Sequence, residues 1–265
     1  MLNRWQKPPI GAQIRLEHPL AQGLVGCWLF NEGQGNRAFD SVWRSPGSIQ
    51  NPDWRPGALH VGDTSNKYVT VACSPDIEPT TLTVVAGCQV ISFTERHEKV
   101  VCKPYISTKS PYQSYTLARE STLSQFCFEI NVNGSLYTIE LGDLVLGEDV
   151  FLAGTFDGTY VKGYQDGQLI TIESHPGAIG YYGTDLYFGD NPIETSAGHP
   201  RYLDCLLYFV LLYRRALSES EISWLYEEPY AMFESYSLVK YFFITSAPTV
   251  NVPVFMQSYR RRRSA

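Results

Sequence analysis

Apolar and polar residues alternate along much of this chain with the period of two that β-strands produce. In the segment 125–131, QFCFEIN, every second residue from Phe126 onward is apolar. We expect these apolar residues to face a core and the intervening Cys127, Glu129 and Asn131 to face water. Several other short runs rich in β-branched and aromatic residues have the same character, so the pattern favours an all-β protein.

Turn signals separate these predicted strands. Asn-Gly occurs at 133–134, and Asp-Gly occurs at 157–158 and at 166–167. Both dipeptides tolerate the positive φ angles that tight hairpin turns require. The segment 150–174 is therefore predicted to be a meander of three strands joined by two tight turns, and not a catalytic loop.

One short helix is predicted near the end of the patterned region. SESEISWLYEE begins with a serine that can cap a helix and has a glutamate three residues later, as in a capping box. Pro229 would stop the helix. The residues that define it are Ser218 and Glu221 for the cap and Ile222, Leu225 and Tyr226 for the apolar face.

Together these elements predict a two-sheet antiparallel sandwich with one short C-terminal helix and extended N- and C-terminal segments. We expect residues 1–22 to form an extended arm, because they contain three prolines and little periodicity. Residues 23–228 would form the domain. Residues 229–265 are too apolar for a free linker, so we predict that they dock on the domain or on a neighbouring subunit.

The charge and the cysteines of the chain bear on what it binds and on where in the cell it is located. The net charge is −6 even though four of the 21 basic residues form a C-terminal run, so the body of the chain is acidic and nucleic acid is not the expected partner. The run is either a solvated end or an anchor that docks to an acidic partner surface or to nucleic acid. The six cysteines lack zinc-site spacing, and neither a signal peptide nor a membrane-spanning segment is recognised. The anchoring residues are Arg260, Arg261, Arg262 and Arg263.

Four segments in order resemble the laminin-G-like, concanavalin A-like jelly-roll family. They are GLVGCWLFNEGQGNRAFDS, RPGALHVGDTSNKYVTV, FLAGTFDGTYVKGYQDGQL and LYFVLLYRRALSESEISWLY. The proline-rich lead-in, HPLAQGLVGCWLFNEG and EEPYAMF are similar to the variety found in bacteriophage-related proteins. The resemblance implies a jelly-roll fold on a virion surface, assembled in the host cytoplasm, with partners among other virion proteins or copies of itself. The fold hosts lectins, adhesion modules and glycosidases alike.

The resemblance also places calcium ligands in this chain. Asp63 and Asp204 occupy positions where family members hold a calcium ion by oxygen ligands. Family members usually have acidic residues before the Tyr-Val, whereas Asn66 and Lys67 precede Tyr68 here, and a lysine would oppose a cation. No cofactor is certain, and calcium is one reading beside that of ordinary polar residues at strand ends.

Aromatic residues in the predicted rim loops are the candidates for ligand binding, because their faces can stack on a sugar ring. The alternative for each is packing over the edge of a sheet. Trp28 is expected in the core instead. The candidates are Trp43, Tyr112, Tyr181 and Tyr182.

No catalytic site is predicted. A glycosidase on this fold needs two facing carboxylates, and neither Glu129 nor Glu140 has an acidic neighbour on the same face of its strand. We expect both to be solvated. The sequence therefore predicts a non-enzymatic virion-associated structural, decoration or adhesion protein that binds a partner protein or a cell-surface glycan. The alternatives are a carbohydrate-binding lectin with calcium dependence and, with less support, a glycoside hydrolase.

Overall fold

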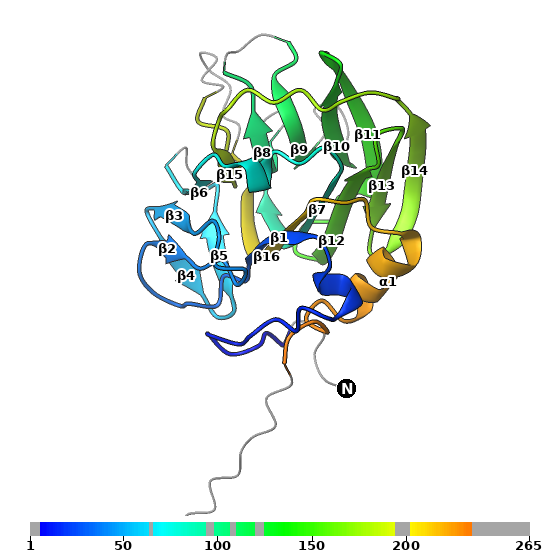
Figure 1. Ribbon diagram of the computed structural model, residues 1–265. Coiled ribbons are helices and arrows are strands. Elements are labelled where there is room, and N and C mark those ends of the chain that lie inside the picture. Colours follow the sequence, from blue (N-terminus) through cyan, green and yellow to red (C-terminus); the bar gives the residue numbers. More distant parts are fainter. Residues whose placement is uncertain are drawn as a thin grey trace, which may run out of the picture. The chain divides into compact units, whose positions relative to one another are not determined.

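The computed structural model describes residues 6–63, 66–93, 98–106, 110–119, 125–193 and 202–234. Their strands form two antiparallel sheets of eight strands each, and α1 (Glu219–Glu227) is their α-helix (Figure 1). The predicted two-sheet antiparallel sandwich with one short helix is confirmed. None of the helices in these ranges is long and apolar enough to span a membrane.

The first sheet is built around two long central strands that pair with each other, β7 and β16. β16 pairs with β5 through its first half and with β1 through its second half. In spatial order the sheet contains β14 (Gln168–Ser174), β13 (Tyr160–Gln165), β12 (Asp149–Phe156), β7 (Leu82–Ser92), β16 (Asp204–Tyr213), β5 (Ala58–Val61) and β4 (Asp53–Arg55), with β1 (Leu24–Trp28) beside β16.

The second sheet faces the first. Its strands are long at the β11 edge, with nine residues, and short at the β2 edge, with two. In spatial order it contains β11 (Ser135–Asp143), β10 (Gln125–Val132), β9 (Gln113–Arg119), β8 (Lys99–Pro104), β15 (Leu186–Phe188), β6 (Tyr68–Val71), β3 (Gly47–Gln50) and β2 (Arg37–Ala38).

The core between the sheets is large and contains the aromatic residues that strand alternation points inward. Trp28 is fully buried, its ring lies 5.1 Å from that of Phe188, and its indole N–H donates to the Ser45 carbonyl at 2.9 Å. Burial of the apolar ring supplies the driving force, and the hydrogen bond satisfies its polar atom. The expectation that Trp28 lies in the core is confirmed.

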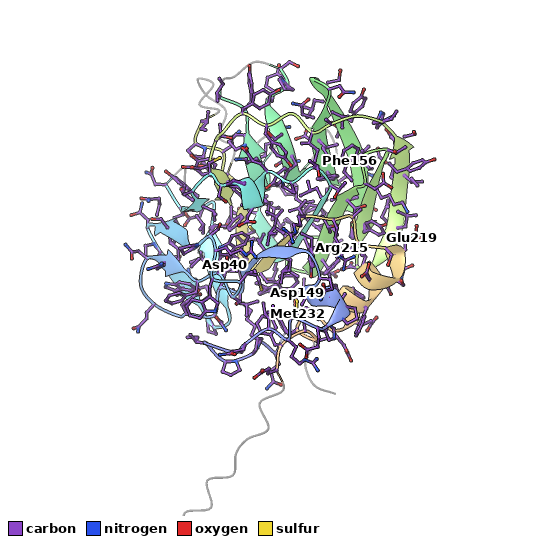
Figure 2. All side chains as sticks on the ribbon, in the orientation of Figure 1. Asp40, Asp149, Phe156, Arg215, Glu219 and Met232 are labelled. Carbon is purple, nitrogen blue, oxygen red and sulfur yellow. The ribbon has the colours of Figure 1, made fainter. Side chains whose placement is uncertain are left out.

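A second apolar cluster covers the outer face of the first sheet. It joins the N-terminal arm, α1 and residues 230–233 to the outward-facing side chains of the sheet, and Met232 at its base is marked in Figure 2. Its fully buried members include Leu20, Phe151, Phe209, Ile222, Leu225 and Met232.

The helix forms as its sequence predicts. Ser218 accepts from the Glu221 N–H, and the Glu221 carboxylate accepts from the Ser218 N–H, which completes the capping box. The Arg215 guanidinium also donates to this carboxylate at 2.8 Å, and this bond lowers the pKa of Glu221 to about 2. Ile222 and Leu225 are buried, and the helix ends two residues before Pro229. Local sequence therefore determines both ends of α1.

The predicted hairpins form, although their turns differ. Asn133 and Asp166 both have positive φ angles of about 50° and are each followed by glycine with positive φ, as a two-residue turn requires. Asp157 has no such angle. Its carboxylate instead accepts from the N–H groups of Thr159 and Tyr160, so the loop between β12 and β13 is longer than a tight turn.

The residues predicted to face water on β10 are buried, so that expectation is wrong for Cys127, Glu129 and Asn131. Strand alternation is present, because Phe128 and Ile130 lie in the core. Glu129 is only 2% exposed and pairs with Lys99. The period-two pattern identifies two faces but does not reveal that both are covered.

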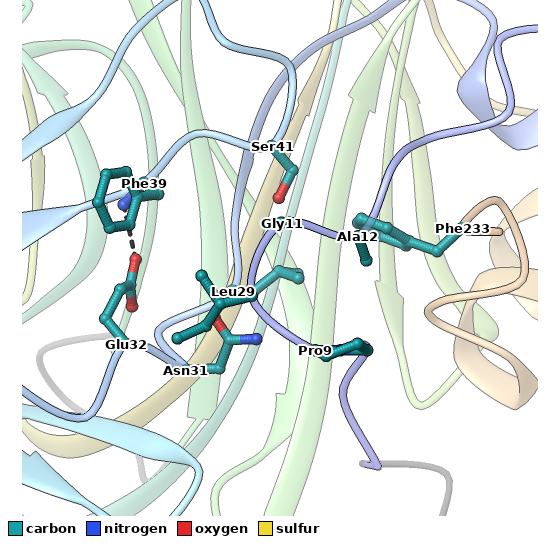
Figure 3. A pocket seen from close by; sticks show the side chains of 10 residues that line it. Pro9, Gly11, Ala12, Leu29, Asn31, Glu32, Phe39, Ser41 and Phe233 are labelled. Carbon is teal, nitrogen blue, oxygen red and sulfur yellow. Dashed lines mark hydrogen bonds between the residues drawn. The ribbon is translucent and has the colours of Figure 1, made fainter. Parts of the chain in front are cut away.

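The N-terminal arm is anchored rather than free. The Lys7 ammonium donates to the backbone carbonyls of Leu29, Phe30 and Tyr208, and burial lowers its pKa to about 7. A 3₁₀ helix, η1 (Pro19–Ala21), ends the arm. Between the arm and the sandwich lies a cavity of only about 30 Å³, which Figure 3 shows beside the Glu32 carboxylate. This space suits one or two water molecules rather than a ligand.

Candidate functional site

The loop that follows β2 is organised by one buried carboxylate, that of Asp40. Its Oδ1 accepts from the N–H groups of Cys27 and Val42 at 2.9 and 3.0 Å, and its Oδ2 accepts from those of Arg44 and Ser45, both at 2.9 Å. Asp40 is 4% exposed and lies at the base of the loop (Figure 2). Three of these charge-assisted bonds fix the backbone of residues 42–45, and the fourth ties Asp40 to Cys27 on β1, so the loop is ordered without a ligand.

This loop presents Trp43 to solvent. The indole is 78% exposed, although tryptophan is normally a highly buried side chain. Its backbone has a φ of 64°, a left-handed conformation that bulky residues rarely adopt and that the Asp40 bonds hold in place. An exposed aromatic on a strained, well-braced loop is a common feature of recognition sites.

A hollow of about 310 Å³ lies beside Trp43. One wall comes from the N-terminal arm and the other from the loop of residues 41–43. Six of its eight lining residues are apolar, and Leu16 is 74% exposed, so the hollow can accept an apolar group. The lining residues are Gln13, Ile14, Leu16, Ala21, Leu24, Ser41, Val42 and Trp43.

The three candidate tyrosines lie apart from the hollow, and two of them share a rim. The Asn131 amide donates to the Tyr182 hydroxyl at 2.8 Å, and the Tyr182 ring meets the edge of Tyr105 at 4.1 Å. The Tyr105 N–H in turn donates to the carbonyl of Tyr112, which is 40% exposed and has a φ of 62°. Tyr112 and Tyr182 are therefore linked through Tyr105.

Tyr181 points inward. Its ring packs against the core between the sheets, and its hydroxyl donates to the Pro79 carbonyl at 2.7 Å. Burial, assisted by the nearby charge of Glu78, raises the pKa of Tyr181 above its usual value. This geometry matches the alternative given above for the rim tyrosines, packing over the sheet edge.

The predicted calcium ligands belong to a network of charged residues. Asp204 and Asp63 both line a cavity of about 60 Å³. The two ring nitrogens of His60 contact Asp204 at 2.7 Å and Asp53 at 2.9 Å. Lys67 bonds Asp53 at 3.1 Å and Asp63 at 2.6 Å. Burial alone would raise the pKa of Asp53, but the hydrogen bonds from His60 and Lys67 lower it to about 2.

These residues fit an ion-pair network better than a calcium site. Asp53, His60 and Asp63 each have one potential ligand atom, a carboxylate oxygen or a ring nitrogen, and these three atoms lie within 4.8 Å of one another. However, the Lys67 ammonium already supplies a positive charge to two of the carboxylates, and imidazole is a poor calcium ligand. Calcium binding remains a prediction, and it would require Lys67 to leave.

The candidate carboxylates of a glycosidase are far from equivalent. Glu129 is buried and lies 3.0 Å from the Lys99 ammonium, and the Gln113 amide also donates to it. Glu140, on β11, is exposed as predicted. The buried Glu129 carboxylate is neutralised by its ammonium partner. Glycoside hydrolysis instead uses two carboxylates that face each other across the scissile bond.

Asp40, Asp53 and His60 were not among the predicted site residues. Asp40 precedes Ser-Val-Trp, and an aspartate that accepts from N–H groups two or more residues ahead is a recognisable turn signal. His60 offered no such signal, because Asp204 is 144 residues away from it in sequence. Arg260, Arg261, Arg262 and Arg263 lie outside the described residues.

Comparison with known proteins agrees with this architecture. The structure of the Trypanosoma rangeli sialidase in complex with sialic acid is 17% identical in sequence and superimposes with a TM-score of 0.61. The match covers 79% of this chain and 33% of the sialidase chain. The binding domain of Paraclostridial Mosquitocidal Protein 1 is 13% identical, with a TM-score of 0.61, and the match covers 78% of this chain and 52% of that chain. The Botulinum Neurotoxin serotype G binding domain is 12% identical, with a TM-score of 0.58, and the match covers 77% of this chain and 50% of that chain.

The chain thus spans about a third to a half of these proteins, and at such identities the likeness concerns the fold alone. A search of curated proteins finds no match. Residues 63–223, more than half of the chain, match the family model described as the concanavalin A-like lectin/glucanases superfamily. The chain belongs to this superfamily.

Proposed function

We propose that this chain is a non-catalytic recognition module that serves as a decoration or adhesion protein on a phage-type particle and binds a partner protein. The observation that carries the proposal is Trp43, an exposed indole on a loop braced by Asp40. A preorganised aromatic anchor lowers the entropy that binding costs. Its neighbouring hollow is mostly apolar, which suits a protein segment better than a sugar, whose hydroxyls need several polar partners.

The absence of catalysis is part of the same proposal. Glu129, one of the two candidate carboxylates, is held by Lys99 and Gln113 on a covered face. Release of reducing sugars that disappears in Glu129→Gln, with the fold retained by circular dichroism, would contradict this part.

The proposal is tested on the products of the neighbouring genes. We expect these genes to encode capsid or tail proteins, and one product to bind the full chain in biolayer interferometry. Trp43→Ala should weaken that binding at least about tenfold, the usual effect of removing a central aromatic anchor. Tyr160→Ala is the matched control, because Tyr160 is 45% exposed but lies on β13, outside the hollow. Equal losses in both variants would contradict the proposal.

A second candidate function is glycan recognition, and a separate observation favours it. Tyr112 is exposed on a rim where Tyr105 and Tyr182 pack together with Asn131, which combines aromatic faces with a polar group. A glycan array run with and without a chelator distinguishes the two. Strong binding to a defined sugar that is lost in Tyr112→Ala and kept in Trp43→Ala would favour the lectin, and sensitivity to the chelator would add calcium.

A further inference from the structure

The hollow beside Trp43 lies where the described part of the chain ends. Phe233 forms an antiparallel bridge with Ile14, and the Glu234 N–H donates to the Gln13 carbonyl at 2.9 Å. Gln13 and Ile14 both line the hollow. The chain therefore leaves the domain at the rim of the hollow, and 31 further residues, 235–265, follow.

Those 31 residues contain an apolar stretch that needs a cover. Residues 239–244 read VKYFFI, five apolar or aromatic residues around one lysine. Such a segment in water would be an exposed hydrophobic patch. The hollow offers the complementary surface, because its walls include the highly exposed side chains of Leu16 and Trp43.

Charge adds a second kind of complementarity. Every charged residue after Glu234 is basic, namely Lys240 and the four arginines 260–263, while all 27 acidic residues of the chain precede Ser235. The C-terminal segment is thus attracted to the acidic body of any copy of this protein. That attraction steers copies toward one another before the apolar contacts form.

The sequence after Glu234 favours a partner copy as the acceptor. Residues 235–238, SYSL, contain no Gly, Pro, Asn or Asp, and their two serines favour a chain reversal more weakly than those residues do. A segment that returned to the hollow beside its own exit would need such a reversal at once. A neighbouring copy requires none.

We infer that the hollow beside Trp43 binds residues 239–244 of a second copy of this chain, with an aromatic side chain of the segment against the indole. The inference rests on the proposed function, since it names the protein partner of the same site. The contact is heterologous, so it makes the protein self-assembling into rings or filaments.

The test is a cross-link in the full-length protein. Trp43 is replaced by the photoreactive residue p-benzoylphenylalanine, and this protein is mixed with isotopically heavy wild-type chain and irradiated. We expect mass spectrometry to find cross-links from position 43 to heavy peptides within residues 235–265. Cross-links only to light peptides of the same chain, only to other regions, or none at all would each overturn the inference.

Assembly gives a second measurement that does not depend on the photoreactive residue. In light scattering across a dilution series, the double variant Phe242→Asp/Phe243→Asp and the single variant Trp43→Ala should each raise the dissociation constant of self-association at least about tenfold. Tyr160→Ala should leave it unchanged. Self-association unaffected by the double variant would overturn the inference.

The inference and the proposed function fail separately. If Trp43→Ala weakens binding to a capsid or tail protein while no cross-link reaches residues 235–265, the hollow binds a different partner, and only the inference is lost. If the cross-link forms but no neighbouring gene product binds, self-assembly stands without the particle.

Discussion

Trp43 and Tyr181 were predicted to play the same part, yet the structure gives their side chains opposite surroundings. Trp43 is directed into solvent by a loop whose N–H groups converge on the buried Asp40 carboxylate. The backbone on either side of Tyr181 is held by other groups, because the Gly183 N–H donates to the Glu78 carboxylate and the Gly180 N–H donates to the Asn131 carbonyl. The Tyr181 hydroxyl itself donates to the Pro79 carbonyl. Both loops are braced by hydrogen bonds, so the difference lies in the ring. Tyr181 packs against the core with its hydroxyl bonded to a carbonyl, whereas the indole of Trp43 stays in solvent.

The strongest way to break this comparison is to remove the brace. Asp40→Ala deletes the acceptor of four buried or partly buried N–H bonds, so we expect the free energy of unfolding to fall by about 3 kcal/mol or more. Chemical denaturation measures the change.

The matched control is Asp76→Ala. Asp76 pairs with Arg44 of the same loop at 3.0 Å, but the two side chains are 30% and 48% exposed, so water screens the pair and the loss should stay below about 1 kcal/mol. Similar losses in the two variants would mean that Asp40 is not the residue that fixes the loop.

A smaller effect is expected on the other side of the comparison. Tyr181→Phe removes the hydroxyl that donates to Pro79 and leaves the ring in place, so the free energy of unfolding should fall by about 1 kcal/mol. Tyr112→Phe, which changes an exposed ring, should have no measurable effect. If Tyr181→Phe is also silent, its inward orientation is not maintained by this bond.

The smallest effect concerns pH. The pKa of Tyr181 is raised above its usual 10.0, so the neutral hydroxyl is favoured in the folded protein. Its contribution to stability is complete below pH 10.0 and is lost as the pH rises above that value. The decline in unfolding free energy with alkaline pH should therefore be shallower in Tyr181→Phe than in wild type.

Other buried tyrosines also contribute to the fall of the unfolding free energy at alkaline pH. Burial also raises the pKa of Tyr115 and Tyr213, so Tyr181→Phe should reduce the slope without abolishing it. A slope identical to that of wild type would show that Tyr181 ionises as freely in the folded protein as in the unfolded chain.

The sequence predicts the features that local patterns control. The capping box at Ser218, the turn at Asn133 and the core position of Trp28 follow from spacing and residue type, and all three are confirmed. The same patterns mispredict Glu129, because alternation reports that a strand has two faces and not how many layers cover them.

The candidate site was predicted only in fragments. Trp43, Asp63 and Asp204 could be singled out by type and place, but their partners come from distant segments. Asp204 meets His60 across 144 residues of sequence, and the hollow beside Trp43 exists only because the N-terminal arm folds back beside the loop. Pairings of this kind depend on the assembled sandwich rather than on any local pattern.

The bridge between Ile14 and Phe233 has a practical consequence for engineering. It ties the two ends of the domain together, and the Arg15 N–H adds a bond to the Met232 carbonyl at 2.9 Å. A glycine-rich linker from Glu234 back to the N-terminal arm could therefore allow the gene to be reopened at an exposed turn such as residues 145–146.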